Sequence, residues 1–211
     1  MYKNSFFFAL VFLSFSSQAE YTENVHYVVM DHSASSYVEG ISDEILVIET
    51  FWYGCPHCYK FEGHINEWKK TIPKDVKLER VPAVFNKIWA LHAKVYFTLK
   101  TIDKLDIYHQ KFFIAIHEQN RNFKDLDSIS NFFENQGMDI NNFRKVFLSD
   151  KITKKVKNAN YMLEEYSIDS VPQIIINNKY KISGKMAKSY KGMIKIMNFL
   201  IKKERGLRAN L

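Results

Sequence analysis

Cysteine is scarce in this chain: its 211 residues include only two, Cys55 and Cys58, both within the stretch FWYGCPHCYKF. A structural zinc site needs four protein ligands, and the seven histidines show no finger-like spacing that would complete such a set. Covalent haem needs Cys-x-x-Cys-His, but Tyr59 follows Cys58. A disulfide across so short a loop removes little entropy from the unfolded chain, so it is a weak structural staple. We therefore expect no metal and no bound cofactor.

Long hydrophobic runs are also scarce. The run from Phe6 to Phe15 is about half the ~20 apolar residues that a membrane-spanning helix needs. Lys3 precedes it, and Ser17-Gln18-Ala19 supplies the small residues of a cleavage site, which is typical of a secretory signal peptide. We expect cleavage after Ala19 and an exported, periplasmic protein that begins at Glu20.

Clustered positive charge is missing as well, although the formal net charge is +7. The lysines are scattered through helical patterns, so we expect no nucleic-acid partner. We interpret the charge as a solvated basic surface, which favours contact with anionic membrane surfaces or with acidic unfolded chains.

The elements that the pattern predicts follow a simple order. They are a buried strand over 44–54, a helix from the cysteines through Trp68 that stops before Pro73, a strand over 76–85, a block of helices, two short strands within 171–183 joined by an Asn-Asn-Lys turn, and a closing helix with Met193, Met197, Leu200 and Ile201 on one face. This order predicts an α/β domain interrupted by a helical insertion. Within the helical block, Gly137 is well placed to end a helix.

The position of the cysteines favours redox chemistry. A strand ending at Gly54 and a helix beginning at Cys55 place this thiol where unpaired N–H groups and the helix dipole favour an anion. Pro56 fits the first turn of a helix, and His57 lies where it adds positive charge or a hydrogen bond. Cys58, one turn further on, is expected to be the less exposed partner. Lowering the pKa of Cys55 stabilises the dithiol form, which makes the disulfide a stronger oxidant.

These residues resemble the DsbA family of periplasmic thiol:disulfide oxidoreductases. The stretches FWYGCPHCYKFE and SVPQIIINNKY carry the resemblance, with Cys55-Pro56-His57-Cys58 matching the active-site sequence. Val171 and Pro172 match the family's Val-cis-Pro, which faces the cysteines and binds substrate. The resemblance implies a thioredoxin-like fold with an all-helical insertion domain. We expect the thioredoxin-like parts at 20–83 and 160–211, the insertion at 84–159 and the signal peptide at 1–19.

The resemblance also extends to charged residues near the cysteines. Glu49, six residues before Cys55, matches a buried acid of the family, and a charge inside an apolar strand needs a partner. Glu62 and Arg80 match an acidic and a basic residue of the same network, although a surface pair of little energetic value is the alternative. Many members have a bulkier residue directly before the first cysteine, where this chain has Gly54. The resemblance therefore does not fix how strong an oxidant the disulfide is.

Three functions remain open at this point. The first is an oxidase that donates the Cys55–Cys58 disulfide to newly exported unfolded proteins with free cysteines. The resemblance implies a monomer that is reoxidised by a DsbB-type, quinone-linked partner in the inner membrane. The second is an isomerase or reductase kept in the reduced form, although only about 25 residues separate the cleavage site from the first strand and leave no room for a dimerisation domain. The third is a non-catalytic holdase for unfolded chains, which the intact Cys-x-x-Cys disfavours.

Overall fold

The computed structural model describes residues 21–30 and 44–208. A five-stranded sheet has the order β1-β5-β4-β2-β3, in which β2 and β3 are parallel and the other neighbouring strands are antiparallel. The strands are β1 (Val28–Val29), β2 (Ile45–Phe51), β3 (Val76–Pro82), β4 (Gln173–Ile176) and β5 (Tyr180–Ser183). The helices are α1 (Pro56–Lys69), α2 (Lys87–Thr101), α3 (Leu105–His117), α4 (Leu126–Glu134), α5 (Ile140–Phe147), α6 (Asp150–Glu165), α7 (Gly184–Ala187) and α8 (Tyr190–Arg208).

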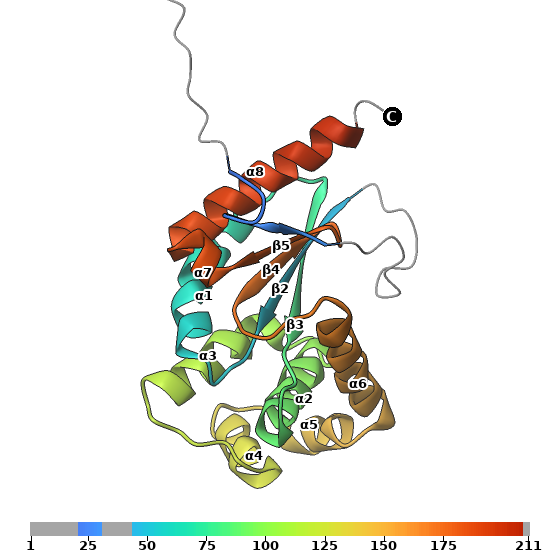
Figure 1. Cartoon of the computed structure of the whole chain (residues 1–211). Coiled ribbons are helices and arrows are strands. Elements are labelled where there is room, and N and C mark those ends of the chain that lie inside the picture. Colours follow the sequence, from blue (N-terminus) through green and yellow to red (C-terminus); the bar gives the residue numbers. More distant parts are fainter. Residues whose placement is uncertain (1–20, 31–43, 209–211) are drawn as a thin grey trace, which may run out of the picture.

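The sheet separates two hydrophobic cores because neighbouring residues of a strand point to opposite faces. Val47 of β2 and Ile174 of β4 pack with α1 and α8 on one face. Ile48 and Ile175 belong to the other core, which continues into the helical block. Figure 1 shows α1 and α8 beside the sheet and the helices α2 to α6 gathered at its far end. The thioredoxin-like fold with helices inserted between β3 and β4 is thus confirmed.

Local sequence signals account for most element ends. Asn86, Asp125, Asp139 and Ser149 each cap the helix that follows by accepting a backbone N–H bond through the side chain. Gly137 has a φ of +81° after α4, as its expected role at a helix end requires.

Three details differ from the sequence-based expectations or add to them. The sequence analysis predicted neither the strand β1 nor the helix α7, because both are too short to give a periodic pattern. The helix α6 continues to Glu165, across the expected boundary at residue 159. The predicted signal peptide and its cleavage after Ala19 lie outside the described residues.

Candidate active site

Cys55 is the N-cap residue of α1 and lies directly after the turn that follows β2. Its backbone is extended (φ −86°, ψ 117°), and its Sγ accepts a hydrogen bond from the backbone N–H of Cys58 at 3.4 Å. Pro56 follows as the first residue of the helix, where its missing N–H costs nothing. Both cysteines are free thiols, with exposed fractions of 8% for Cys55 and 0% for Cys58. The more exposed thiol is therefore the one at the helix N-terminus, as expected.

The environment separates the acidities of the two thiols. The hydrogen bond from the Cys58 side chain is the largest influence that lowers the pKa of Cys55, to about 6. Burial opposes it, and the backbone N–H groups of Cys58 and His57 and the charge of His57 add to the lowering. Burial raises the pKa of Cys58 well above its usual value, and the neighbouring Cys55 raises it further. Near neutral pH, the thiolate therefore resides on Cys55.

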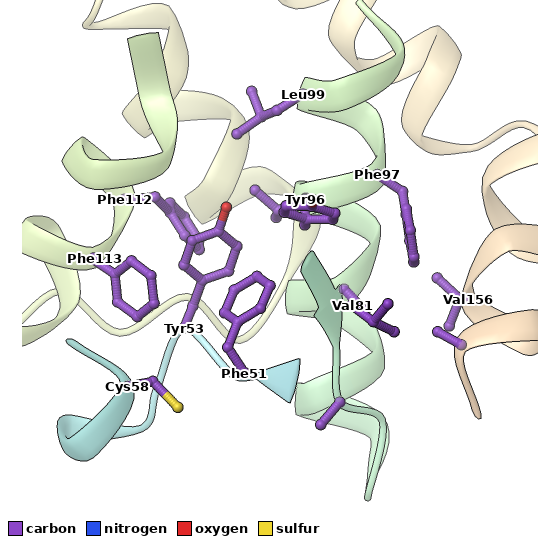
Figure 2. Close-up of a cluster of buried hydrophobic side chains, with 14 of the residues drawn as sticks. Phe51, Tyr53, Cys58, Val81, Tyr96, Phe97, Leu99, Phe112, Phe113 and Val156 are labelled. Atoms are coloured by element: carbon purple, nitrogen blue, oxygen red, sulfur yellow. The ribbon is translucent and has the colours of Figure 1, made fainter. Parts of the chain in front are cut away.

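Figure 2 shows Cys58 at the edge of a cluster of buried aromatic side chains, close to Phe51 and Tyr53. Cys58 and both aromatic side chains are fully buried. Such surroundings hold a neutral thiol in place and keep water away from it, since a thiolate there would lose its hydration.

The loop before β4 closes the site from the other side. The peptide bond between Val171 and Pro172 is cis, as the resemblance implied. The Cys55 thiol donates a hydrogen bond to the carbonyl of Val171 at 3.5 Å, although the two residues are 116 positions apart in the chain. Both residues proposed to bind substrate therefore lie at the reactive thiol.

His57 is exposed, and its Nδ1 is 3.0 Å from the hydroxyl of Tyr190. Tyr190 begins α8, and its ring packs near the rings of Phe61 and His64. Sequence reasoning missed Tyr190 because no local pattern connects the start of the last helix with the first. The structure thus gives the His57 side chain a definite position next to Cys55.

The charged residues Glu49, Glu62 and Arg80 form a buried network. Arg80 donates to Glu49 at 2.8 Å and to Glu62 at 3.3 Å, and the side chains are 10%, 0% and 1% exposed, respectively. Glu49 and Arg80 are register partners on the parallel strands β2 and β3, which explains their contact. The alternative of a surface pair for Glu62 and Arg80 is therefore wrong.

Burial raises the pKa of Glu49 to about 7, although Arg80 opposes this change. Burial also acts to raise the pKa of Glu62, but hydrogen bonds and charges from His109, Arg80 and Asn66 outweigh it and lower that pKa. Of the two carboxyl groups, Glu62 is the one that stays ionised. Glu49 in turn acts to raise the pKa of Cys58, so the network and the buried thiol influence each other.

Two members of this network were not expected from the sequence. The Tyr53 hydroxyl lies 2.7 Å from His109 Nδ1, and His109 Nε2 lies 3.4 Å from a Glu62 oxygen. This pattern suits a neutral imidazole in which Nε2–H donates to the carboxylate and Nδ1 accepts from the phenol. Burial lowers the pKa of His109, in agreement with a neutral ring. In the sequence, His109 could be noticed only as a polar residue on an apolar face of a helix. Its partners lie in other segments, so no local pattern connects them with His109.

Gly54, the departure from the common family pattern, is explained by the ring of Trp52. A Cβ atom at Gly54 would lie only 2.3 Å from that ring, which is stacked on Trp89 with ring centroids 4.1 Å apart. Glycine is therefore required here for space, not for an unusual backbone angle.

Within residues 21–30 and 44–208, no group of three or more His, Cys, Asp or Glu side chains is arranged to hold a metal ion. No helix in the same ranges is long and apolar enough to cross a membrane.

Comparison with known proteins agrees with this geometry. A sequence profile for the DSBA-like thioredoxin domain matches residues 65–189. The thiol:disulfide interchange protein DsbA of Azotobacter vinelandii is 33% identical over 77% of this chain and 76% of its own length. Its counterpart in Pseudomonas aeruginosa is 31% identical over 88% and 87%, respectively. The crystal structure of Pseudomonas aeruginosa DsbA superimposes with a TM-score of 0.83 at 32% identity, covering 90% of this chain and 97% of that one. A dithiol at a helix N-terminus, a cis-proline loop facing it and these relatives together show that the chain belongs to the DsbA family of thiol:disulfide oxidoreductases.

Proposed function

We propose that this protein is a thiol:disulfide oxidase that donates its Cys55–Cys58 disulfide to unfolded proteins with free cysteines. The observation that carries the proposal is the difference between the two thiols. Stabilisation of the Cys55 thiolate, with its pKa of about 6, favours the reduced protein and makes the disulfide oxidising. Curated relatives at 31–33% identity are named thiol:disulfide interchange proteins, which supports the same conclusion.

The transfer proceeds in two exchanges. A substrate thiolate attacks Cys55 Sγ, forms a mixed disulfide and releases Cys58, which takes up a proton because its pKa is high. A second substrate thiolate then attacks the substrate sulfur of the mixed disulfide and releases Cys55 as a thiolate. Two electrons pass from the substrate to the protein, and the substrate gains one disulfide. Cys55 is a good leaving group in the second exchange because its thiolate is stabilised.

The remaining residues have supporting roles in this proposal. Pro56 and His57 lie between the cysteines and tune the Cys55 thiolate, and the network of Glu49, Glu62 and Arg80 controls protonation around Cys58. The Val171 carbonyl and Pro172 form the wall on which an extended substrate segment lies. The part of the chain that follows cleavage at Ala19 acts in the periplasm as a monomer. A DsbB-type membrane protein reoxidises it and passes the electrons on to quinone.

Equilibration of the purified protein with glutathione buffers of known composition tests the oxidase. We expect a reduction potential more oxidising than that of protein disulfide isomerase, which is about −180 mV. A potential near the roughly −270 mV of thioredoxin would contradict the oxidase and support a reductase. Replacement of both cysteines by Ala is the control, since it abolishes redox exchange and leaves the fold to be checked by circular dichroism.

A further inference from the structure

A pocket of about 760 Å³ is lined by residues that neighbour or contact Cys55, although neither cysteine lines it. His57, at the start of α1, forms part of one wall, and Val171 and Pro172 form another. Met186 and Tyr190, from α7 and the start of α8, also line it. The Val171 carbonyl in this wall is the one that accepts the hydrogen bond from the reactive thiol. The pocket therefore lies next to the place that a substrate cysteine must reach.

The lysines that line the pocket differ in how they are engaged. Lys181 donates to two backbone carbonyls, at 3.0 and 2.9 Å. Lys185 and Lys188 are exposed, and their ammonium groups make no hydrogen bond or ion pair within the described ranges 21–30 and 44–208. The acid in the lining, Asp169, already accepts hydrogen bonds from neighbouring side chains. The pocket therefore combines an apolar wall with two ammonium groups that have no partner among the residues that the structure describes.

We propose that Lys185 and Lys188 make this pocket selective for substrate segments with acidic residues beside the reacting cysteine. The inference rests on the proposed function and names its substrate class. A cavity of this volume is about 9 Å across, which is the reach of about three extended residues. Acidic side chains within about three positions of the cysteine therefore lie near both ammonium groups, while an apolar neighbour contacts the wall.

The size of the preference follows from the exposure of the lysines. A solvent-exposed ion pair changes an equilibrium by about 1.4- to 5-fold, so two such pairs give roughly 2- to 30-fold. Salt screens exposed pairs, because the Debye length falls from about 30 Å at 0.01 M to about 3 Å at 1 M ionic strength. The preference is therefore largest at low salt and disappears at high salt.

Rates of disulfide transfer to designed peptides test this selectivity. Two unstructured peptides, each with two cysteines, carry either two Glu or two Lys next to the first cysteine. Each rate with the oxidised protein is divided by the rate of the same peptide with an uncharged small disulfide, bis(2-hydroxyethyl) disulfide, which removes the effect of the flanking charge on the reactivity of the peptide thiol. We expect the normalised rate of the acidic peptide to exceed that of the basic peptide by about 2- to 30-fold at low salt.

Charge-reversal variants separate the pocket from the overall charge. The double substitution Lys185→Glu and Lys188→Glu is expected to abolish or invert the preference. The matched control is Lys151→Glu with Lys154→Glu, which changes the net charge equally at exposed positions of α6. Figure 1 shows α6 in the helical block, across the molecule from α7. The control is expected to keep most of the preference, and circular dichroism checks that both variants are folded.

The outcomes distinguish a failure of the selectivity from a failure of the proposed function. Equal normalised rates for both peptides would overturn the selectivity and leave the oxidase standing. An equal loss of preference in both variants would assign it to net charge and also overturn the role of Lys185 and Lys188. If neither peptide is oxidised, the proposed function fails, and the selectivity fails with it.

Discussion

Replacing Cys58 tests how the Cys55 thiolate is stabilised. The hydrogen bond from the Cys58 side chain is the strongest influence that lowers the Cys55 pKa to about 6. Cys58→Ala removes this donor but keeps the backbone N–H of residue 58, which lies 3.4 Å from Cys55 Sγ. Cys58→Ser is the matched control, because its hydroxyl also donates. We therefore expect the Cys55 pKa to rise in the Ala variant and to change little in the Ser variant.

The size of the effect follows from the strength of a hydrogen bond to a charged group, which contributes about 1.5–3 kcal/mol. Since one pKa unit corresponds to about 1.4 kcal/mol, the Cys55 pKa is expected to reach about 7–8 in the Ala variant. At pH 7, the thiolate of the reduced wild-type protein outnumbers the thiol by about ten to one. In the Ala variant, the two forms become comparable or the thiol predominates.

Two measurements follow this change. Ultraviolet absorbance of the thiolate against pH gives the midpoint directly. The rate of alkylation by iodoacetamide gives it independently, because only the thiolate reacts and its population grows as pH rises through the pKa. The alkylation midpoint is expected to move to higher pH in the Ala variant alone. Identical midpoints in the Ala and Ser variants would refute the reasoning and assign the stabilisation to the backbone N–H groups of the helix terminus.

Three further predictions concern the surroundings of the cysteines. Because burial raises the Glu49 pKa from 4.5 to about 7, its contribution to the unfolding free energy is complete below pH 4.5 and is lost as pH rises to about 7. Denaturant titrations should show that Glu49→Gln removes up to about 3 kcal/mol of this pH dependence, and an unchanged profile would contradict the pKa. Pro172→Ala frees the backbone beside the reactive thiol, so non-reducing gels should show trapped mixed disulfides with substrate proteins. These adducts should disappear when Cys55 is also replaced by Ser. Adducts that persist without Cys55 would exclude the role of Pro172. Gly54→Ala should lower the free energy of unfolding by about 1–3 kcal/mol, because the new Cβ meets the indole ring of Trp52. Gly63→Ala in α1 is the control and should raise it by about 0.5–1 kcal/mol, since its Cβ meets no atom within 4 Å. Equal effects in denaturant titrations would contradict the steric argument.

The sequence alone predicted the parts of the site that depend on local chemistry. An apolar strand followed at once by Cys55-Pro56-His57-Cys58 specifies a thiol at a helix N-terminus, where unpaired N–H groups stabilise an anion. The same local reasoning gave the order of strands and helices, because hydrophobic periodicity follows from the geometry of each element. It could not detect β1 or α7, since neither spans a full period.

The tertiary structure decided which distant residues meet. The parallel register of β2 and β3 places Glu49 beside Arg80, and the packing of α3 against α1 brings His109 to Glu62. Burial then excludes the alternative of a surface pair for Glu62 and Arg80, and it leaves a network that moves the pKa of each carboxyl group. Likewise, the contact between His57 and Tyr190 joins residues 133 positions apart. Local patterns depend only on neighbours in the chain, whereas these contacts depend on how whole elements pack. The sequence therefore determined where the reactive thiol lies, and the packing determined the groups that surround it.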